Sequence, residues 1–413
     1  MRTIVLLRCL CICIMIMLLG TSLPRGLRAE ESIPQPPELQ SEAAILIDAR
    51  SGAVLFGKNA TERLYPASIT KIVTGIIALE SADPEEIVTV SKEARYEDGT
   101  RVYLAEGEQV TLGNLVYALM LNSGNDAATA IAEHISGSKA LFADKMNAFA
   151  KETVGVFDTQ FTNPHGLPDP AHYTTASDMA KIAQYAMRNE RFREIVATDK
   201  MPWNGKEWQS QLDNHNKLLT TYEGTLGVKN GYTQAAGNTL VIAAQRGGME
   251  LIGVILKAST NKAIYAEMTK LLDYGFAAFE PRQLFAAGET YKYGTGAEGE
   301  SPRMFVAEEE LWTAAPKHEI ADMQVDALGS VTMSTPSRTW TAGMLTLQTP
   351  PAESAQAVEA GSEAAGAAED IEEEKAVAAS GWELPIAGAW LLMNIMLGAI
   401  AYMKLRKRAM RGA

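Results

Sequence analysis

The sequence predicts an α+β protein, with a central sheet and a helical lobe in its first domain and short strands in a second. Strand-like apolar segments occur near both ends of residues 30–276, whereas the middle of this range has apolar residues at helical spacing. Over residues 277–350, short runs of β-forming residues alternate with Gly, Pro and Ser, which favours a small β domain. Its expected strands cover residues 289–293, 303–306, 323–327, 331–333 and 344–347.

Residues 1–29 have the features of a secretory signal peptide. Arg2 and Arg8 lie around an apolar run that continues from Cys9 to Leu19, and cleavage is expected after Ser22 or Ala29. All three cysteines of the chain lie in this segment. The mature chain would therefore contain no disulfide, cysteine nucleophile or cysteine–metal site.

The first motif that indicates chemistry is Ser68-Ile-Thr-Lys71, at the start of an apolar helical run. A serine hydroxyl attacks a carbonyl only when a nearby base takes its proton, and Lys71 lies one turn after Ser68 on the same face. A helix N-terminus also favours a developing oxyanion. A helix cap followed by a surface lysine has the same pattern, which recurs at Ser136 and Ser259.

Two further polar motifs follow in the chain. Ser123-Gly-Asn125 separates two apolar helical stretches and predicts an interhelical turn, although ordinary helix caps would explain it equally well. Lys229-Asn-Gly231 lies on a predicted strand that leads into a hairpin. A lysine there can hold an anionic substrate group, and the alternative is an edge-strand lysine that opposes aggregation.

The ordered set of motifs, separated by 55 and 106 residues, resembles the penicillin-binding serine acyltransferases, and most closely the low-molecular-weight D-alanyl-D-alanine carboxypeptidases. The likeness extends over about residues 41–276 and includes Phe161-Thr-Asn-Pro-His-Gly-Leu167. It implies a penicillin-binding/β-lactamase-like domain with a central antiparallel sheet. It also implies removal of the terminal D-alanine from peptidoglycan stem peptides through an acyl-enzyme that penicillin mimics. No metal or organic cofactor is implied.

The resemblance assigns a role to each matching residue. Ser68 is the expected nucleophile, Lys71 its base and Ser123 a proton relay. The expected substrate-binding residues are Asn125, Lys229, Asn230 and Gly231, and the backbone N–H groups of Ser68 and Tyr232 are expected to form the oxyanion hole. A lysine base at neutral pH needs a lowered pKa, which burial and the second ammonium of Lys229 would both provide.

Two positions depart from the family pattern. The usual Thr of the third motif is Asn230, and Ile264 stands where relatives often have an arginine for the substrate carboxylate, with Lys262 two residues earlier. These departures keep a DD-endopeptidase and a catalytically weak, membrane-anchored peptidoglycan-binding protein open as alternatives. A class A β-lactamase would need a deacylating glutamate, which the loop of residues 161–169 lacks. His165 in that loop is expected to have a scaffolding role.

The C-terminal part of the sequence predicts membrane attachment. Residues 351–383 form an acidic Ala/Glu-rich linker, and residues 384–403 are apolar enough for a transmembrane helix. The basic tail of residues 404–413 places the C-terminus in the cytoplasm and the catalytic domain outside the cell membrane, as a single-pass protein. An amphipathic surface anchor is the alternative, but the segment lacks a charged face.

The net charge argues against nucleic acid as a partner. The whole chain has a charge of −13, which becomes −22 when the four arginines of residues 1–29 and the five basic residues of residues 404–413 are left aside. An acidic outward part does not attract phosphate backbones. The expected partners are therefore the stem peptide, β-lactams and the membrane.

Overall fold

The computed structural model describes residues 33–294 and 303–348. The predicted signal peptide, acidic linker, apolar segment 384–403 and basic tail all lie outside these residues. Among the residues described, none of the helices has the length and apolar character to cross a membrane.

A five-stranded antiparallel sheet organises residues 33–278, with the strand order β2-β1-β9-β8-β7. Its strands are β1 (Ala43–Asp48), β2 (Val54–Lys58), β7 (Thr225–Thr233), β8 (Gly237–Arg246) and β9 (Met249–Ala258). β1 pairs with β9, so the two sequence ends of the domain meet in the middle of one sheet. This arrangement confirms the central sheet that the strand signals at both ends predicted.

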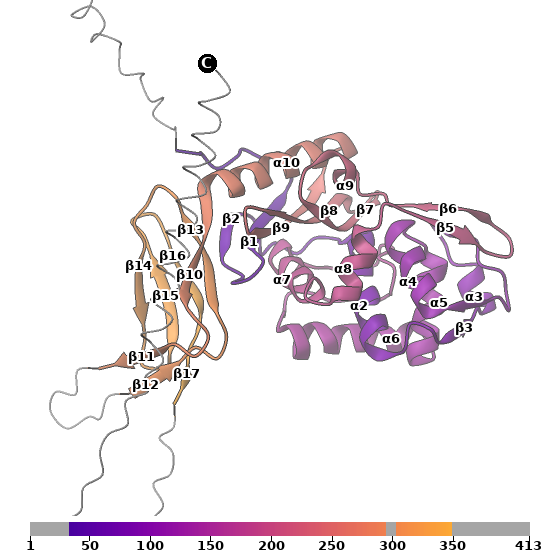
Figure 1. Ribbon diagram of the computed structural model, residues 1–413. Coiled ribbons are helices and arrows are strands. Elements are labelled where there is room, and N and C mark those ends of the chain that lie inside the picture. The colour runs from indigo at the N-terminus through magenta and orange to yellow at the C-terminus, as the bar shows by residue number, and fades with distance from the viewer. Residues whose placement is uncertain (1–32, 295–302, 349–413) are drawn as a thin grey trace, which may run out of the picture. The chain divides into compact units, whose positions relative to one another are not determined.

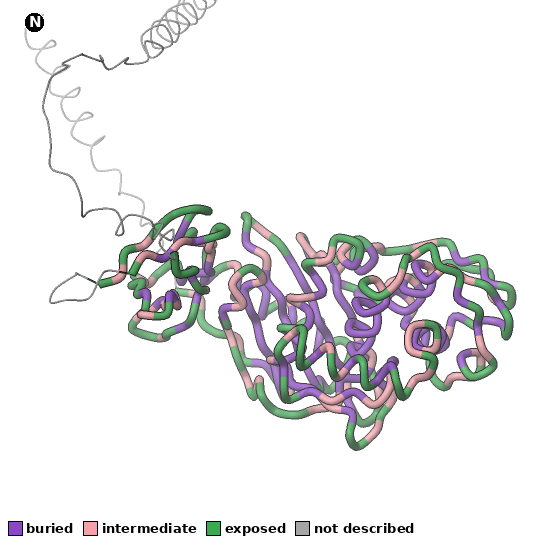
Figure 2. The backbone as a smooth tube through the Cα atoms, turned by 90° about the horizontal axis from the view of Figure 1, so that it is seen from below, coloured by how far each residue is buried: buried purple, intermediate pink, exposed green. Residues whose placement is uncertain are grey.

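Both faces of this sheet are covered. On β1, Ile45 and Ile47 belong to one apolar cluster with the helical lobe, while Ala44 and Leu46 belong to a second cluster with α10. Figure 1 shows α10 on one side of the sheet and α7 and α8 on the other. Figure 2 shows the buried residues continuing from the strands into the helices. Burial on both faces explains why these strands are nearly continuous in apolar residues.

The helical lobe lies between β2 and β7 in the sequence. Its elements are η1 (Ala67–Thr70), α2 (Lys71–Ser81), β3 (Ile87–Thr89), α3 (Lys92–Arg95), β4 (Gln109–Thr111), α4 (Leu112–Leu121), α5 (Asn125–Ser136), α6 (Lys139–Ala148), η2 (Phe149–Val154), α7 (Ala176–Ala186), α8 (Glu190–Ala197), β5 (Lys200–Asn204), β6 (Gln209–Asp213) and α9 (Leu218–Thr221). α10 (Asn261–Ala278) follows the sheet.

The chain after α10 forms only strands within the described residues. They are β10 (Phe279–Phe285), β11 (Thr290–Tyr293), β12 (Arg303–Val306), β13 (Leu311–Pro316), β14 (Asp322–Val325), β15 (Ser330–Ser334), β16 (Thr339–Met344) and β17 (Thr346–Leu347). Each of the five predicted stretches overlaps a strand. The sequence analysis did not predict β10, β13 and most of β16. Pro281 lies inside β10 and weakens its strand signal.

Candidate active site

Ser68 lies on a short turn that leads directly into a buried helix. The turn η1 is a 3-10 turn, and Lys71 is the first residue of α2. Ile69 and Thr70 are fully buried and fix the turn, while Ser68 keeps partial exposure. Ala67 has a positive φ of 52°, an uncommon conformation for a residue with a Cβ that is often found at functional sites.

The Lys71 ammonium nitrogen is buried and has three hydrogen-bond partners. Nζ lies 3.1 Å from Ser68 Oγ, 2.7 Å from Asn125 Oδ1 and 2.7 Å from the carbonyl oxygen of His165. The amide oxygen and the carbonyl oxygen can only accept hydrogen bonds. A neutral amine must therefore donate its two protons to them, so its lone pair remains for the hydroxyl of Ser68. The geometry orients Lys71 as a base toward Ser68.

The electrostatic surroundings favour this neutral form. Burial lowers the pKa of Lys71 well below its usual value, and the positive charge of Lys229 lowers it further, whereas Asp126 and Glu97 act in the opposite direction. Burial also lowers the pKa of Lys229 to about 7. These are the two causes that the sequence analysis expected for Lys71.

The second motif occupies the predicted turn between α4 and α5. Ser123 is buried with a positive φ of 60°, and Asn125 is the first residue of α5. The Asn125 side chain accepts from Lys71 and donates from Nδ2 to the carbonyl oxygen of Asp98 at 2.6 Å. Asn125 therefore contacts Lys71 directly, in addition to the substrate contact expected of it.

The third motif lies on β7, the edge strand next to Ser68. A Cβ built on Gly231 would lie only 2.6 Å from the backbone N of Ser68, so β7 passes close to the Ser68 turn. Thr239 on β8 donates to the carbonyl oxygen of Pro66 at 2.9 Å and fixes this approach. Lys229 is 1% exposed and donates to the carbonyl oxygen of Asn230 at 3.0 Å. A buried lysine does not protect a strand edge in solvent.

A loop around His165 closes the other side of Lys71. Thr74 on α2 donates to the carbonyl oxygen of Pro164 at 2.6 Å, next to the Lys71–His165 contact. Gly166 has a φ of 88°, and a Cβ there would lie 1.9 Å from the carbonyl oxygen of Ala67. Only glycine allows the loop to pack so closely against the turn that carries Ser68.

A family profile described as D-alanyl-D-alanine carboxypeptidase matches residues 30–260. The chain belongs to this family. It is 38% identical over 260 residues to "D-alanyl-D-alanine carboxypeptidase DacF" of Bacillus subtilis, covering 61% of this chain and 66% of the relative. It is 32% identical over 305 residues to DacD of Escherichia coli, also named a D-alanyl-D-alanine carboxypeptidase, covering 70% of this chain and 76% of that protein.

Solved structures show the same fold. The structure of penicillin binding protein 5 from Haemophilus influenzae aligns with a TM-score of 0.66 and 29% identity, over 76% of this chain and 98% of that one. The Streptomyces K15 DD-transpeptidase aligns with a TM-score of 0.56 and 32% identity, over 59% and 99% of the two chains. The α+β fold of this family, which the motifs predicted, is thereby shown.

The two departures from the family motifs lie in different surroundings. Ile264 is 2% exposed on α10 and belongs to the apolar cluster on that face of the sheet, so its side chain is not available to a substrate. Asn230 lies on β7 between Lys229 and Gly231 and is partly exposed. Asn230 thus places an amide on β7 beside Gly231, which lies close to the Ser68 turn.

The sequence analysis missed two contributions to the site. The backbone carbonyl of His165 carries no side-chain signal, so the motif around it suggested only a scaffold. Glu97 lies in a polar stretch without a motif, yet its carboxylate reaches the His165 imidazole. Neither contact has a local pattern, because His165 and Lys71 are 94 positions apart in the chain. Among the described residues, no group of acidic, histidine or cysteine side chains is arranged to hold a metal ion.

Proposed function

We infer that this protein is a serine D-Ala-D-Ala carboxypeptidase, which removes the terminal D-alanine of peptidoglycan stem peptides and is inhibited covalently by penicillin. The observation that carries this inference is the contact between Ser68 Oγ and the buried Lys71 Nζ at 3.1 Å, in a chain that belongs to the carboxypeptidase family. The names of the curated relatives supply the reaction.

The first chemical step forms an ester on Ser68. Neutral Lys71 takes the hydroxyl proton while Oγ attacks the carbonyl carbon of the penultimate D-alanine. The backbone N–H groups of Ser68 and Tyr232 stabilise the oxyanion, since Gly231 places β7 against the nitrogen of Ser68. The proton then passes through Ser123 to the amine of the departing D-alanine. Water hydrolyses the ester and restores the free hydroxyl.

Substrate binding uses the polar groups that surround this centre. Asn125 uses one N–H on Asp98 and retains its second for a carbonyl oxygen of the stem peptide. Lys229 supplies positive potential for the terminal carboxylate, and Asn230 supplies an amide donor in place of the usual hydroxyl. Because Ile264 contributes no charge, we propose that carboxylate recognition depends on β7 alone and is weaker than in relatives with an arginine.

We propose that the catalytic domain acts outside the cell membrane, with a cytoplasmic C-terminus. The support lies in the sequence: a signal-like segment in residues 1–29, an apolar stretch at residues 384–403 and the basic residues that follow it. Protease digestion of intact cells and of opened cells tests this orientation. Digestion of the catalytic domain only after the cells are opened would refute it.

The reaction is tested with Ser68→Ala in the purified full chain. Wild type should bind a fluorescent penicillin covalently and release D-alanine from a D-Ala-D-Ala peptide, and the variant should do neither. Ser259→Ala is the matched control, because Ser259 begins a second Ser-x-x-Lys pattern but is exposed. Continued labelling of Ser68→Ala would refute Ser68 as the nucleophile.

The same preparation separates the alternatives. Cleavage of a cross-linked dimer with no release of D-alanine would show an endopeptidase. Tight binding of peptidoglycan without labelling or product would show a binding protein.

A further inference from the structure

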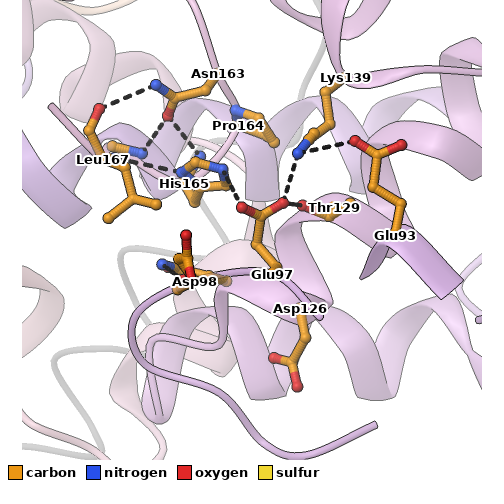
Figure 3. A network of polar contacts seen from close by, with 12 residues as sticks. Glu93, Glu97, Asp98, Asp126, Thr129, Lys139, Asn163, Pro164, His165 and Leu167 are labelled. Carbon is orange, nitrogen blue, oxygen red and sulfur yellow. Dashed lines mark hydrogen bonds and ion pairs between the residues drawn. The ribbon is translucent and has the colours of Figure 1, made fainter. Parts of the chain in front are cut away.

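A polar network connects the His165 loop, beside Lys71, to α5 and α6 of the helical lobe. Its centre is Glu97, in the segment after α3, whose side chain is 9% exposed. The carboxylate accepts from Thr129 Oγ1 on α5 and from Lys139 Nζ on α6, both at 2.7 Å. Figure 3 shows it between these two residues and the His165 imidazole. One carboxylate thus joins α5, α6 and the loop that contains His165.

The contacts of His165 determine which ring nitrogen faces Glu97. The backbone N–H of Leu167 donates to Nδ1 of His165 at 3.3 Å, so Nδ1 acts as an acceptor in this geometry. In the neutral imidazole the proton is then on Nε2, which lies 3.4 Å from Glu97 Oε1. The ring is held from both sides, by its own loop and by Glu97.

Neighbouring residues also anchor the loop, since Gly166 packs against the carbonyl oxygen of Ala67 and His172 joins Thr162 to Thr70. Asn163 Oδ1 accepts from the backbone N–H of His165 at 3.3 Å and of Gly166 at 2.7 Å, but both contacts are internal to the loop. Pro164 is attached to α2 through Thr74. At His165, the side-chain contact to Glu97 ties this residue to the helical lobe.

We propose that Glu97 is a positioning residue for catalysis: it holds the His165 imidazole and thereby fixes the backbone carbonyl that orients the amine of Lys71. The proposal rests on the proposed function, because it concerns the base of that reaction. If the carbonyl moves, the amine can turn its lone pair away from Ser68, and proton transfer slows.

The charge of Glu97 has a second, separable effect. The carboxylate raises the pKa of Lys71, whereas burial and the charge of Lys229 lower it. The pKa of Glu97 itself lies well below the usual range, because His165, Lys139 and Thr129 all donate to its carboxylate. Burial keeps the pKa of His165 low, so the imidazole stays neutral when Lys71 is the base. The other titratable groups that act on the Glu97–His165 pair are Lys71, Lys139 and His172, while Glu93 acts on Lys139. Asp126 and Lys229 act on Lys71.

The test compares three variants of the full chain by the rate of penicillin acylation as a function of pH. Glu97→Ala removes both the contact with His165 and the charge. Glu97→Gln keeps the size and, with its amide oxygen toward Thr129 and Lys139, the hydrogen bond from Thr129, but it removes the charge and turns an N–H₂ donor toward the Nε2–H of His165, so the contact with His165 is lost. Glu93→Gln is the matched control. Glu93 also binds Lys139, at 2.9 Å, but its exposed side chain belongs to none of the His165 contacts.

We expect Glu97→Ala to lower the maximal acylation rate about tenfold or more, with little change in penicillin affinity. In both Glu97 variants the Lys71 ammonium loses a stabilising negative charge, so the pKa of Lys71 falls. The rising limb of the profile of acylation rate against pH should therefore move toward lower pH by about 0.5 to 1 unit. Glu93→Gln should retain the wild-type rate and limb. Glu97→Gln carries the test if Glu97→Ala fails to fold.

Three results would overturn the proposal. The first is a wild-type rate and pH limb in Glu97→Gln. The second is the same change in Glu93→Gln. The third is a loss of acylation rate in proportion to the loss of thermal stability, with the pH profile unchanged. That result would mean that Glu97 has a structural role only. Wild type that fails to react with penicillin at any pH would instead overturn the proposed function.

Discussion

Gly231→Ala tests whether acylation of Ser68 requires the close approach of β7 to the backbone of Ser68. The added Cβ would lie 2.6 Å from the backbone N of Ser68 and 2.7 Å from Thr239 Oγ1, whereas ordinary contacts begin at 3.4 Å. The backbone cannot rotate away as a flexible side chain would. β7 must therefore move by about 0.8 Å relative to the turn that carries Ser68.

A displacement of about 1 Å in an active site costs on the order of 10²-fold in rate. We therefore expect Gly231→Ala to lower the second-order rate constant of penicillin acylation by about 10²-fold, because the oxyanion hole between Ser68 and Tyr232 widens. Stopped-flow fluorescence with a labelled penicillin measures this constant. Thermal unfolding of the same samples shows whether the fold is retained.

Gly57→Ala is the matched control on the same sheet. Gly57 lies on β2, and a Cβ there would meet its nearest neighbours at 3.9 and 4.0 Å. Its rate should equal that of wild type, and its stability should be unchanged or slightly higher, since alanine reduces the entropy of the unfolded chain. An acylation rate in Gly231→Ala within twofold of wild type would refute the role assigned to this contact.

Three further changes test the buried basic groups. Lys71→Met should lower the acylation rate by about 10²- to 10⁴-fold while the protein stays folded, because a general base is lost. Stopped-flow measurement of penicillin acylation tests this loss of rate. Lys229→Met should raise the free energy of unfolding at pH 6 by on the order of 3 to 5 kcal/mol, because the native pKa is about 7 and the unfolded chain keeps its proton up to about 10.5. This gain should disappear as the pH approaches 10, and denaturant titrations at both pH values that give equal gains would contradict it. In wild type, burial lowers the pKa of His172 to about 4, so between pH 6.5 and pH 4 the unfolded chain binds a proton at this residue that the folded protein does not. The free energy of unfolding should therefore fall by on the order of 3 kcal/mol between pH 6.5 and pH 4. His172→Gln should flatten this part of the curve, and an unchanged slope would assign the loss to other groups.

His172 and Asn230 differ in how much of their role the amino-acid sequence predicts. No local pattern in the sequence assigns a role to His172. In the structure Thr162 N–H donates to its Nδ1 at 3.0 Å and Nε2 lies 2.9 Å from Thr70 Oγ1, so it joins the loop to the Ser68 turn. Asn230, by contrast, is visible in the sequence because it replaces the usual Thr of the third motif. A residue inside a motif can be interpreted from its neighbours, whereas a contact across 102 positions cannot.

The chain order alone determined that Ser68 and Lys71 share one helical face, that a turn begins α5 at Asn125 and that Lys229 lies on a strand. Local hydrogen bonding and side-chain periodicity fix such features within one or two turns of chain. The tertiary structure decided what those groups do together, because burial and the partners of Lys71 come from segments 54 and 94 positions away. The direction of the lone pair of Lys71, its lowered pKa and the connection to Glu97 depend on packing that no local pattern encodes.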